Sequence, residues 1–223
     1  GGGGWGRGGG GATGGEGRGK IWATTRGIST AAMAFNPVVA VCDACILYPF
    51  HLGNVIVQAA VDRLVQARWT NEIHDEWMRN LIANVPDLSV ERLNTTKQLM
   101  TIALPDATVS EYEKHIETIS LPDPDDRHVV AAAIEAKATH ILTWNLRHFP
   151  VPILKAHGLV RQTPDAFLAD LYDRVPQLLL ASLANARRNL SKSGLSAEAF
   201  LDVLRDQKLT QLDKRLRGHL DDL

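Results

Sequence analysis

The sequence predicts an α/β fold built around a central, mainly parallel sheet. Two continuous apolar runs of strand length, VVAVC at 38–42 and HILTW at 140–144, are typical of strands that helices cover on both faces. Helical patterns fill most of the chain between these runs, and such alternation favours a doubly wound sheet. From residue 164 onward the pattern is helical, so additional C-terminal helices are expected.

Hydrophobic period and chain-breaking residues place each element in order. The elements expected in the first part are a strand at 38–42, helices at 52–67, 71–83 and 89–102, a short strand at 106–110 and a short helix at 111–116. Those expected afterwards are a helix at 123–137, strands at 140–144 and 159–162, and helices at 164–174, 177–189, 196–206 and 211–220.

The first 35 residues differ in composition from the rest of the chain. Residues 1–20 hold 13 of the 18 glycines and almost no apolar side chains, so they cannot bury enough surface to offset chain entropy. We expect 1–35 to be a disordered or non-native extension, with the native protein beginning at Met33. The remaining units are 36–163, which contains the sheet, and 164–223, the C-terminal helices.

Composition limits the classes of protein and ligand. The chain has 24 Lys+Arg against 25 Asp+Glu, so a nucleic-acid ligand would need a local basic rim. No apolar stretch approaches the roughly 20 residues that span a bilayer, and we expect a cytoplasmic protein without membrane contact. Cys42 and Cys45 form a CxxC, which could be a redox pair or half a zinc site; the favoured interpretation is buried, reduced thiols.

The stretch LPDPDDRHVVAAAI at 121–134 combines a helix start with an unusual concentration of carboxylates. Asp123 suits the N-cap, Pro124 suits the first helical position, and the helix dipole favours the following acids. Asp126 lies at helical spacing from Val130, in line with the face that must be buried. Capping alone does not explain that direction.

Two more polar side chains follow buried strands, and one more acid lies on a helix face. Asp43 comes directly after the first strand, and Asn145 after the strand at 140–144. Glu76 lies beside Trp77 in the apolar stripe of the helix at 71–83. Ligands of open α/β sheets bind at the carboxyl ends of the strands, where Asp43, Glu76 and Asp126 could meet. Oxygen ligands alone suit Mg²⁺ or Mn²⁺ rather than zinc.

Four segments, taken in order, resemble the motifs of PIN-domain ribonucleases of the bacterial toxin (VapC-like) type. They are VCDACILYPF with Asp43, WTNEIHDEWMRNL with Glu76, DPDDRHVVAAA with Asp126 and TWNLRHFP with Asn145. The resemblance covers about 38–167 and implies a three-layer α/β/α PIN-like fold, Mg²⁺- or Mn²⁺-dependent hydrolysis of RNA and an antitoxin partner. Asn145 stands where the family usually carries Asp, which predicts a single, weakly bound metal ion.

The resemblance also suggests a role for each site residue. Asp43, Glu76 and Asp126 would hold the metal, Asn145 would orient the attacking water or a ligand, and the four would form the catalytic set. Thr143 would brace the loop and Asp123 would act from outside the ligand shell. Candidates for contact with RNA phosphates are Arg127, His128, Arg147 and His148.

Other interpretations remain. A haloacid-type phosphatase needs a second Asp where Cys45 stands. The body of the chain has no Gly-rich loop that could bind phosphate. The chain also lacks the paired acids and the Lys that a receiver domain needs. The alternative from another class is a non-catalytic PIN-like module that binds RNA or protein. In the C-terminal helices an apolar stripe is expected to pack first on the core and second in a homodimer; it comprises Leu168, Leu171, Val175, Leu178 and Leu179.

Overall fold

The structure, a computed structural model, describes residues 22, 35–48, 50–190 and 193–223. At its centre is a four-stranded sheet of order β2-β1-β3-β4, in which each neighbouring pair is parallel. The strands are β1 (Val39–Cys42), β2 (Gln66–Arg68), β3 (His140–Leu142) and β4 (Val160–Gln162). The parallel sheet confirms the predicted class.

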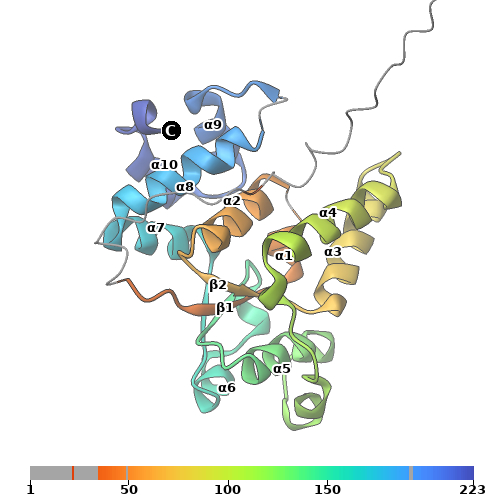
Figure 1. The fold of residues 1–223 in the computed structure, drawn as a ribbon. Coiled ribbons are helices and arrows are strands. Elements are labelled where there is room, and N and C mark those ends of the chain that lie inside the picture. The colour runs from red at the N-terminus through yellow and green to blue at the C-terminus, as the bar shows by residue number, and fades with distance from the viewer. Residues whose placement is uncertain (1–21, 23–34, 49, 191–192) are drawn as a thin grey trace, which may run out of the picture.

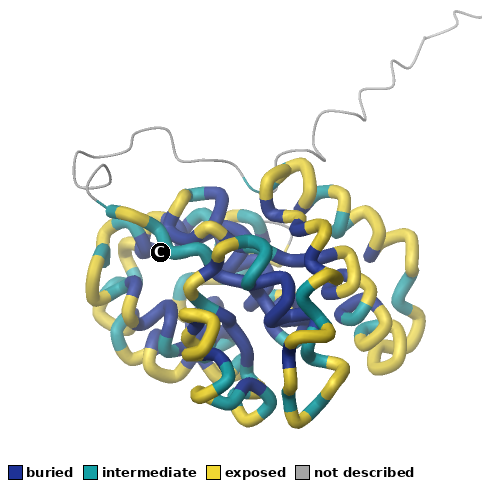
Figure 2. Tube along the Cα trace, turned by 90° about the horizontal axis from the view of Figure 1, so that it is seen from below, coloured by how far each residue is buried: buried dark blue, intermediate teal, exposed yellow. Residues whose placement is uncertain are grey.

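Helices cover both faces of this sheet, which gives the three-layer α/β/α arrangement (Figure 1). The α-helices up to β4 are α1 (Ala44–Leu47), α2 (Phe50–Val61), α3 (Asn71–Asn84), α4 (Val90–Ala103), α5 (Arg127–Glu135) and α6 (Val151–Ala156). Short 3-10 helices occupy Pro105–Ala107, Glu113–Thr118, Pro124–Asp126, Leu146–His148 and Leu220–Asp222. The most deeply buried chain runs through the middle of the molecule, where the strands lie (Figure 2).

The predicted helix at 52–67 is wrong in its last part. The helix α2 ends at Val61, and residues 66–68 form the edge strand β2 instead. Arg63 adopts a positive φ of 62°, which breaks the helix and turns the chain back toward β1. Leu64 and Val65 are buried and continue the apolar pattern of the helix, so hydrophobic period alone hides this break.

The predicted strand at 106–110 is also wrong, because only a single bridge forms there. Within the described part of the chain, Thr108 makes an isolated parallel bridge with Trp69 and belongs to no named strand. The backbone N–H of Val109 donates to the Trp69 carbonyl at 2.8 Å, and the Trp69 N–H donates to the Ala107 carbonyl at 3.0 Å. This short contact protects the free edge of the sheet just beyond β2.

After β4 the chain is helical, as predicted. The helices are α7 (Pro164–Arg174), α8 (Pro176–Arg188), α9 (Ala197–Asp206) and α10 (Thr210–Leu216). Of the expected apolar stripe, Leu168, Leu171 and Leu179 are buried within the single chain, and Val175 and Leu178 pack partly on the core. The helix α7 packs on α10 and α8, and α8 packs on α2. The first of the two expected uses of the stripe is therefore confirmed.

Buried amides fix the position of α8 on α2. The Asn54 side chain, 4% exposed, donates from Nδ2 to the Ala186 carbonyl at 2.8 Å. Asn189 donates to Oδ1 of Asn54 at 3.0 Å and to Oε1 of Gln58 at 2.9 Å. A buried amide without partners is unfavourable, so these bonds favour one orientation of the two helices.

Most of the predicted N-terminal extension, including Met33, lies outside the described residues. Trp22 and Phe35 are described. The indole N–H of Trp22 donates to Oδ1 of Asn54 at 3.2 Å, and the Arg174 guanidinium lies 5.0 Å from the centre of the Phe35 ring. None of the helices in the described ranges is both long enough and apolar enough to span a bilayer.

The start of α10 depends on a carboxylate from another helix. Asp165 in α7 is 5% exposed and accepts hydrogen bonds from the backbone N–H groups of Gln211 and Leu212, each at 3.0 Å. These N–H groups belong to the first turn of α10, where no partner exists within the helix. Asp165 therefore caps α10 and joins it to α7.

We expect Asp165→Ala to lower the free energy of unfolding by about 1–3 kcal/mol, because two backbone donors in the first turn of α10, one of them buried, lose their acceptor. Asp173→Ala is the control: Asp173 also lies in α7, but its carboxylate is exposed and pairs with Arg215 at 2.7 Å. Exposed ion pairs contribute little, so the control should unfold like the wild type. Urea denaturation measures both, and equal losses of stability would contradict the capping role.

Candidate active site

Asp43 follows the central strand β1 and is almost completely buried, with 3% of its surface exposed. Its backbone N–H donates to the Leu142 carbonyl at 3.0 Å, which continues the pairing of β1 with β3. The Thr143 hydroxyl and the Cys45 thiol both donate to Oδ2 of Asp43, at 2.6 Å and 3.2 Å. The orientation of this carboxylate is thus fixed from the β3 side.

The environment of Asp43 disfavours its negative charge. Burial raises the pKa of Asp43 above its usual value, and the charge of Glu76 raises it further, while the bonds from Thr143 and Cys45 only partly oppose this. A buried carboxylate next to a second one is stabilised by a cation. The electrostatic environment of Asp43 therefore favours a bound cation.

Glu76 approaches from α3, which Thr70 starts by accepting the N–H of Ile73 at 3.0 Å. Its neighbours Ile73 and Trp77 are buried and anchor the helix on the core. The Glu76 side chain is 32% exposed and its Oε2 lies 3.6 Å from Nε2 of His128. Glu76 therefore stands at the border between the core and solvent, near the charge of Asp43.

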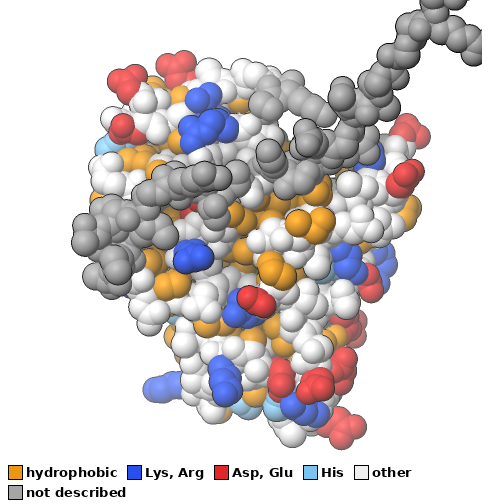
Figure 3. Space-filling view, in the orientation of Figure 1, with side chains coloured by type: hydrophobic (Ala, Val, Ile, Leu, Met, Phe, Trp, Pro, Cys, Tyr) orange, Lys and Arg blue, Asp and Glu red, His pale blue; other side chains and the backbone are white. Residues whose placement is uncertain are grey.

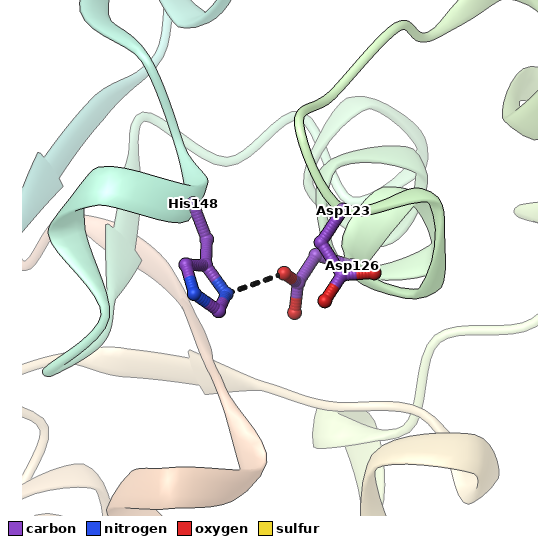
Figure 4. A group of neighbouring side chains, drawn as sticks. All are labelled: Asp123, Asp126 and His148. Atoms are coloured by element: carbon purple, nitrogen blue, oxygen red, sulfur yellow. Dashed lines mark hydrogen bonds and ion pairs between the residues drawn. The ribbon is translucent and has the colours of Figure 1, made fainter.

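Asp126 ends the 3-10 turn Pro124–Asp126, and α5 begins one residue later at Arg127. Asp123 caps that turn by accepting the N–H of Asp125 at 3.0 Å, as the sequence predicts. Asp126 is partly buried, and Nδ1 of His148 lies 2.8 Å from its Oδ2 (Figure 4). Burial raises the pKa of Asp126, the His148 bond opposes the rise, and the charge of Asp43 adds to it.

The structure brings one set of possible ligands closest together. Among the described residues, the His, Cys, Asp and Glu side chains whose ligand atoms lie within 4.8 Å of one another are Asp123, Asp126 and His148 (Figure 4). Asp43 and Glu76 lie outside this group. They still interact with it through charge, since Asp43 raises the pKa of Asp126 and Glu76 raises that of Asp43.

His128 does not lie on the surface where a phosphate contact was expected. Its ring is 6% exposed, 3.8 Å from Glu72 and 3.6 Å from Glu76. Burial lowers the pKa of His128, but the two neighbouring glutamates and Asp43 outweigh it and raise the pKa overall. The helix α5 is buried on all sides from His128 to Ala133, so this ring contacts carboxylates rather than solvent.

Asn145 is more exposed than Asp43, Glu76 and Asp126, the acids it was grouped with. The residue is exposed, and its side chain makes no capping hydrogen bond to the turn that follows. Its backbone N–H donates to the Thr143 hydroxyl at 2.9 Å, so Asn145 supports Asp43 through Thr143. Thr143 is fully buried, and its hydroxyl joins the Asn145 backbone to the Asp43 carboxylate.

Two arginines and an unexpected third flank the site. Arg147 is exposed in the 3-10 turn Leu146–His148, and Arg127 is half-buried with Nε donating to the Pro124 carbonyl at 3.0 Å. Arg161 in β4 donates to the carbonyls of Leu146 and Phe149 and so fixes both ends of the turn. Sequence reasoning missed Arg161, because nothing in a strand pattern indicates which loop its side chain reaches.

Cys42 and Cys45 are free thiols, as expected. Burial raises the pKa of each to about 12, so both stay protonated at neutral pH. Cys45 is half-buried rather than buried, and its bond to Asp43 makes it part of the site. Its position two residues after Asp43 was the available signal for this contact.

We predict that Asp43→Asn stabilises the metal-free protein at pH 7 by about 1 kcal/mol, because it removes a buried charge. The raised pKa values of Asp43 and Asp126 mean that the folded state binds these protons more tightly than the unfolded chain does. Wild-type stability therefore falls as pH rises from the ordinary carboxyl pKa of 3.8 through the raised values.

The measurement is urea unfolding in EDTA at several pH values between 4 and 8. Asp43→Asn should show a weaker decline than the wild type. Asp75→Asn is the control, since Asp75 lies one residue from Glu76 but is 67% exposed. A less stable Asp43→Asn variant with an unchanged decline would contradict the electrostatic account of Asp43.

Comparisons with known proteins agree with this architecture. A PIN domain family model matches residues 39–147, and a VapC50 C-terminal domain model matches residues 164–218. Over 64 residues the chain is 39% identical to "Putative ribonuclease VapC50" of Mycobacterium tuberculosis (strain ATCC 25618 / H37Rv), which is 27% of this chain and 38% of that protein. The match thus spans well under two thirds of the curated relative. No solved structure matches. Residues 39–147 thus form a PIN domain of the VapC type, and residues 164–218 match the VapC50 C-terminal domain family.

Proposed function

We propose that the protein is a metal-dependent endoribonuclease that hydrolyses phosphodiester bonds of RNA. The observation that carries this proposal is the buried Asp43 carboxylate, whose charge is opposed by burial and by Glu76. Asp126 adds a third carboxylate to the same neighbourhood. Membership of the PIN family and the likeness to a relative named as a ribonuclease support the same conclusion.

The donor set of the site suits a hard divalent cation. Asp43, Glu76 and Asp126 would hold Mg²⁺ or Mn²⁺ through carboxylate oxygens. Such an ion, when bound, supplies a Lewis acid for the phosphate and lowers the pKa of a coordinated water. The protein's own contribution is orientation: Thr143 and Cys45 hold the Asp43 carboxylate, and the backbone of Asn145 holds Thr143.

RNA would approach through local contacts, since the global charge is close to zero. On the face shown in Figure 3, Lys and Arg side chains alternate with Asp and Glu and form no broad basic surface. Arg147 is exposed on the loop that also carries His148, and Arg127 follows Asp126 directly. Arginine forks bind phosphate oxygens in pairs, so these two residues are the proposed phosphate contacts.

The proposed domain roles, biological role and partners rest on the likeness to VapC proteins. We propose that residues 36–163 form the nuclease unit, that 164–223 stabilise it by covering α2, and that the protein is the cytoplasmic toxin of a toxin-antitoxin pair. Its partners would be an RNA substrate, a cognate antitoxin protein and, in a homodimer, a second copy. The likeness to VapC50 supports the toxin role.

We expect Asp43→Asn and Asp126→Asn each to lower the rate of cleavage of single-stranded RNA by about 100-fold or more. Each removes a charge that would hold the ion, and metal stabilisation of the transition state amounts to several kcal/mol. Cleavage assays with Mg²⁺ and with Mn²⁺ measure the effect, and Asp75→Asn should retain the wild-type rate. RNA binding without metal-dependent cleavage by the wild type would instead favour the non-catalytic binding module.

Arg147→Ala should raise KM for RNA by about tenfold and leave kcat close to the wild-type value, because a lost phosphate contact of about 1–2 kcal/mol weakens ground-state and transition-state binding alike. Arg79→Ala, an exposed substitution on α3, serves as the control. The effect should shrink as salt concentration rises. An unchanged KM at low salt would exclude Arg147 from the RNA path.

A further inference from the structure

We infer that His148, rather than Asn145, is a ligand of the proposed centre, and that with Asp123 and Asp126 it selects Mn²⁺ over Mg²⁺. This inference rests on the proposed function and names the ligand set and the metal of that same site. Asn145 and His148 lie three positions apart on one loop, yet Asn145 is exposed and His148 is half-buried against Asp126.

The loop after β3 decides which residue reaches the acids. The Asn145 N–H is bound to Thr143, the His148 N–H donates to the Asn145 carbonyl at 2.9 Å, and the resulting turn leaves Asn145 exposed. The same turn directs the His148 ring toward Asp126 (Figure 4). Arg161 holds the carbonyls on both sides of His148, so the direction of the ring is built into the loop.

The atoms around His148 form a mixed donor set. Nδ1 of His148 lies 2.8 Å from Asp126, and one carboxylate oxygen of Asp123 completes a group within 4.8 Å. The His148 and Asp126 side chains are 29% and 18% exposed, so an ion can reach them from solvent. Asp126 belongs both to this group and to the carboxylates near Asp43, which makes it the common member of the centre.

An imidazole nitrogen changes which ion fits. Mg²⁺ is a hard ion that prefers oxygen ligands and keeps several waters, whereas first-row transition ions accept imidazole readily. A site of carboxylates alone would bind either ion. A site with one nitrogen donor discriminates in favour of Mn²⁺. It does not need a carboxylate at position 145, where this chain has Asn.

The opposite possibility is that His148 only neutralises Asp126 as an ion pair. The two roles predict opposite signs for His148→Gln. As a ligand, His148 contributes to Mn²⁺ affinity, so its loss weakens binding. As a positive charge beside Asp126 it competes with the metal, so its loss leaves Mn²⁺ binding unchanged or strengthens it.

The experiment titrates the full chain with Mn²⁺ and follows the ion by electron paramagnetic resonance. The free-ion signal gives Kd, and pulsed spectra report nitrogen coupling from a coordinated imidazole. We expect nitrogen coupling in the wild type and its loss in His148→Gln, with Kd for Mn²⁺ weakened by about tenfold or more. Competition with Mg²⁺ should show that His148→Gln loses most of the preference for Mn²⁺.

Two variants serve as controls. His115→Gln removes an imidazole that pairs with Glu135 at 2.8 Å, outside the proposed centre, and should keep the coupling. Asn145→Ala should keep it as well. Nitrogen coupling that is absent from the wild type, or retained in His148→Gln, overturns the inference.

Failure of the inference can be told apart from failure of the proposed function. If Mn²⁺ binds and Asp43→Asn abolishes binding, but no nitrogen couples to the ion, the carboxylate centre stands and His148 is not a ligand. If Mn²⁺ does not bind to the wild type at millimolar concentration, both the centre and the role of His148 are wrong.

Discussion

The site depends on one constraint, the burial of an ionisable carboxylate at the end of the central strand. Asp43 follows a strand whose last three residues are fully buried, so it leaves the core without reaching open solvent. Thr143 and Cys45 hold it in place, but their hydrogen bonds do not cancel the effect of burial and of Glu76 on its pKa. The fold therefore maintains an electrostatic cost at this position, which a bound cation would relieve.

The parallel sheet determines which segments reach that carboxylate. Because β1 and β3 are parallel neighbours, Asp43 and Thr143 emerge side by side, and the loop after β3 must cross the carboxyl edge of the sheet. Arg161, from the next strand outward, holds this loop by two of its carbonyls. Arg161 thus positions His148 against Asp126 through the backbone of the loop.

The C-terminal helices extend the hydrophobic core that lies around α2. The helix α2 is buried along nearly its whole length, and α8 supplies one side of that environment. The amide bonds from Asn54 to Ala186 and from Asn189 to Asn54 give the contact a defined orientation that apolar packing alone would not impose. The helix α2 in turn packs on α1, which begins directly after Asp43, and on β2, the strand beside β1.

The fold class and most helices could be predicted from the sequence alone, because hydrophobic period and strand ends are local properties. Asp43, Glu76 and Asp126 could be named from those patterns, although the activity they serve remains a prediction. The end of α2 could not be found, since Leu64 and Val65 continue an apolar pattern while a positive φ at Arg63 turns the chain. The burial of His128 among glutamates, the exposure of Asn145 and the contact of His148 with Asp126 are visible only in the three-dimensional structure. These outcomes depend on how a loop crosses the sheet and which distant side chain, here Arg161, holds its carbonyls, and sequence spacing does not encode those distances.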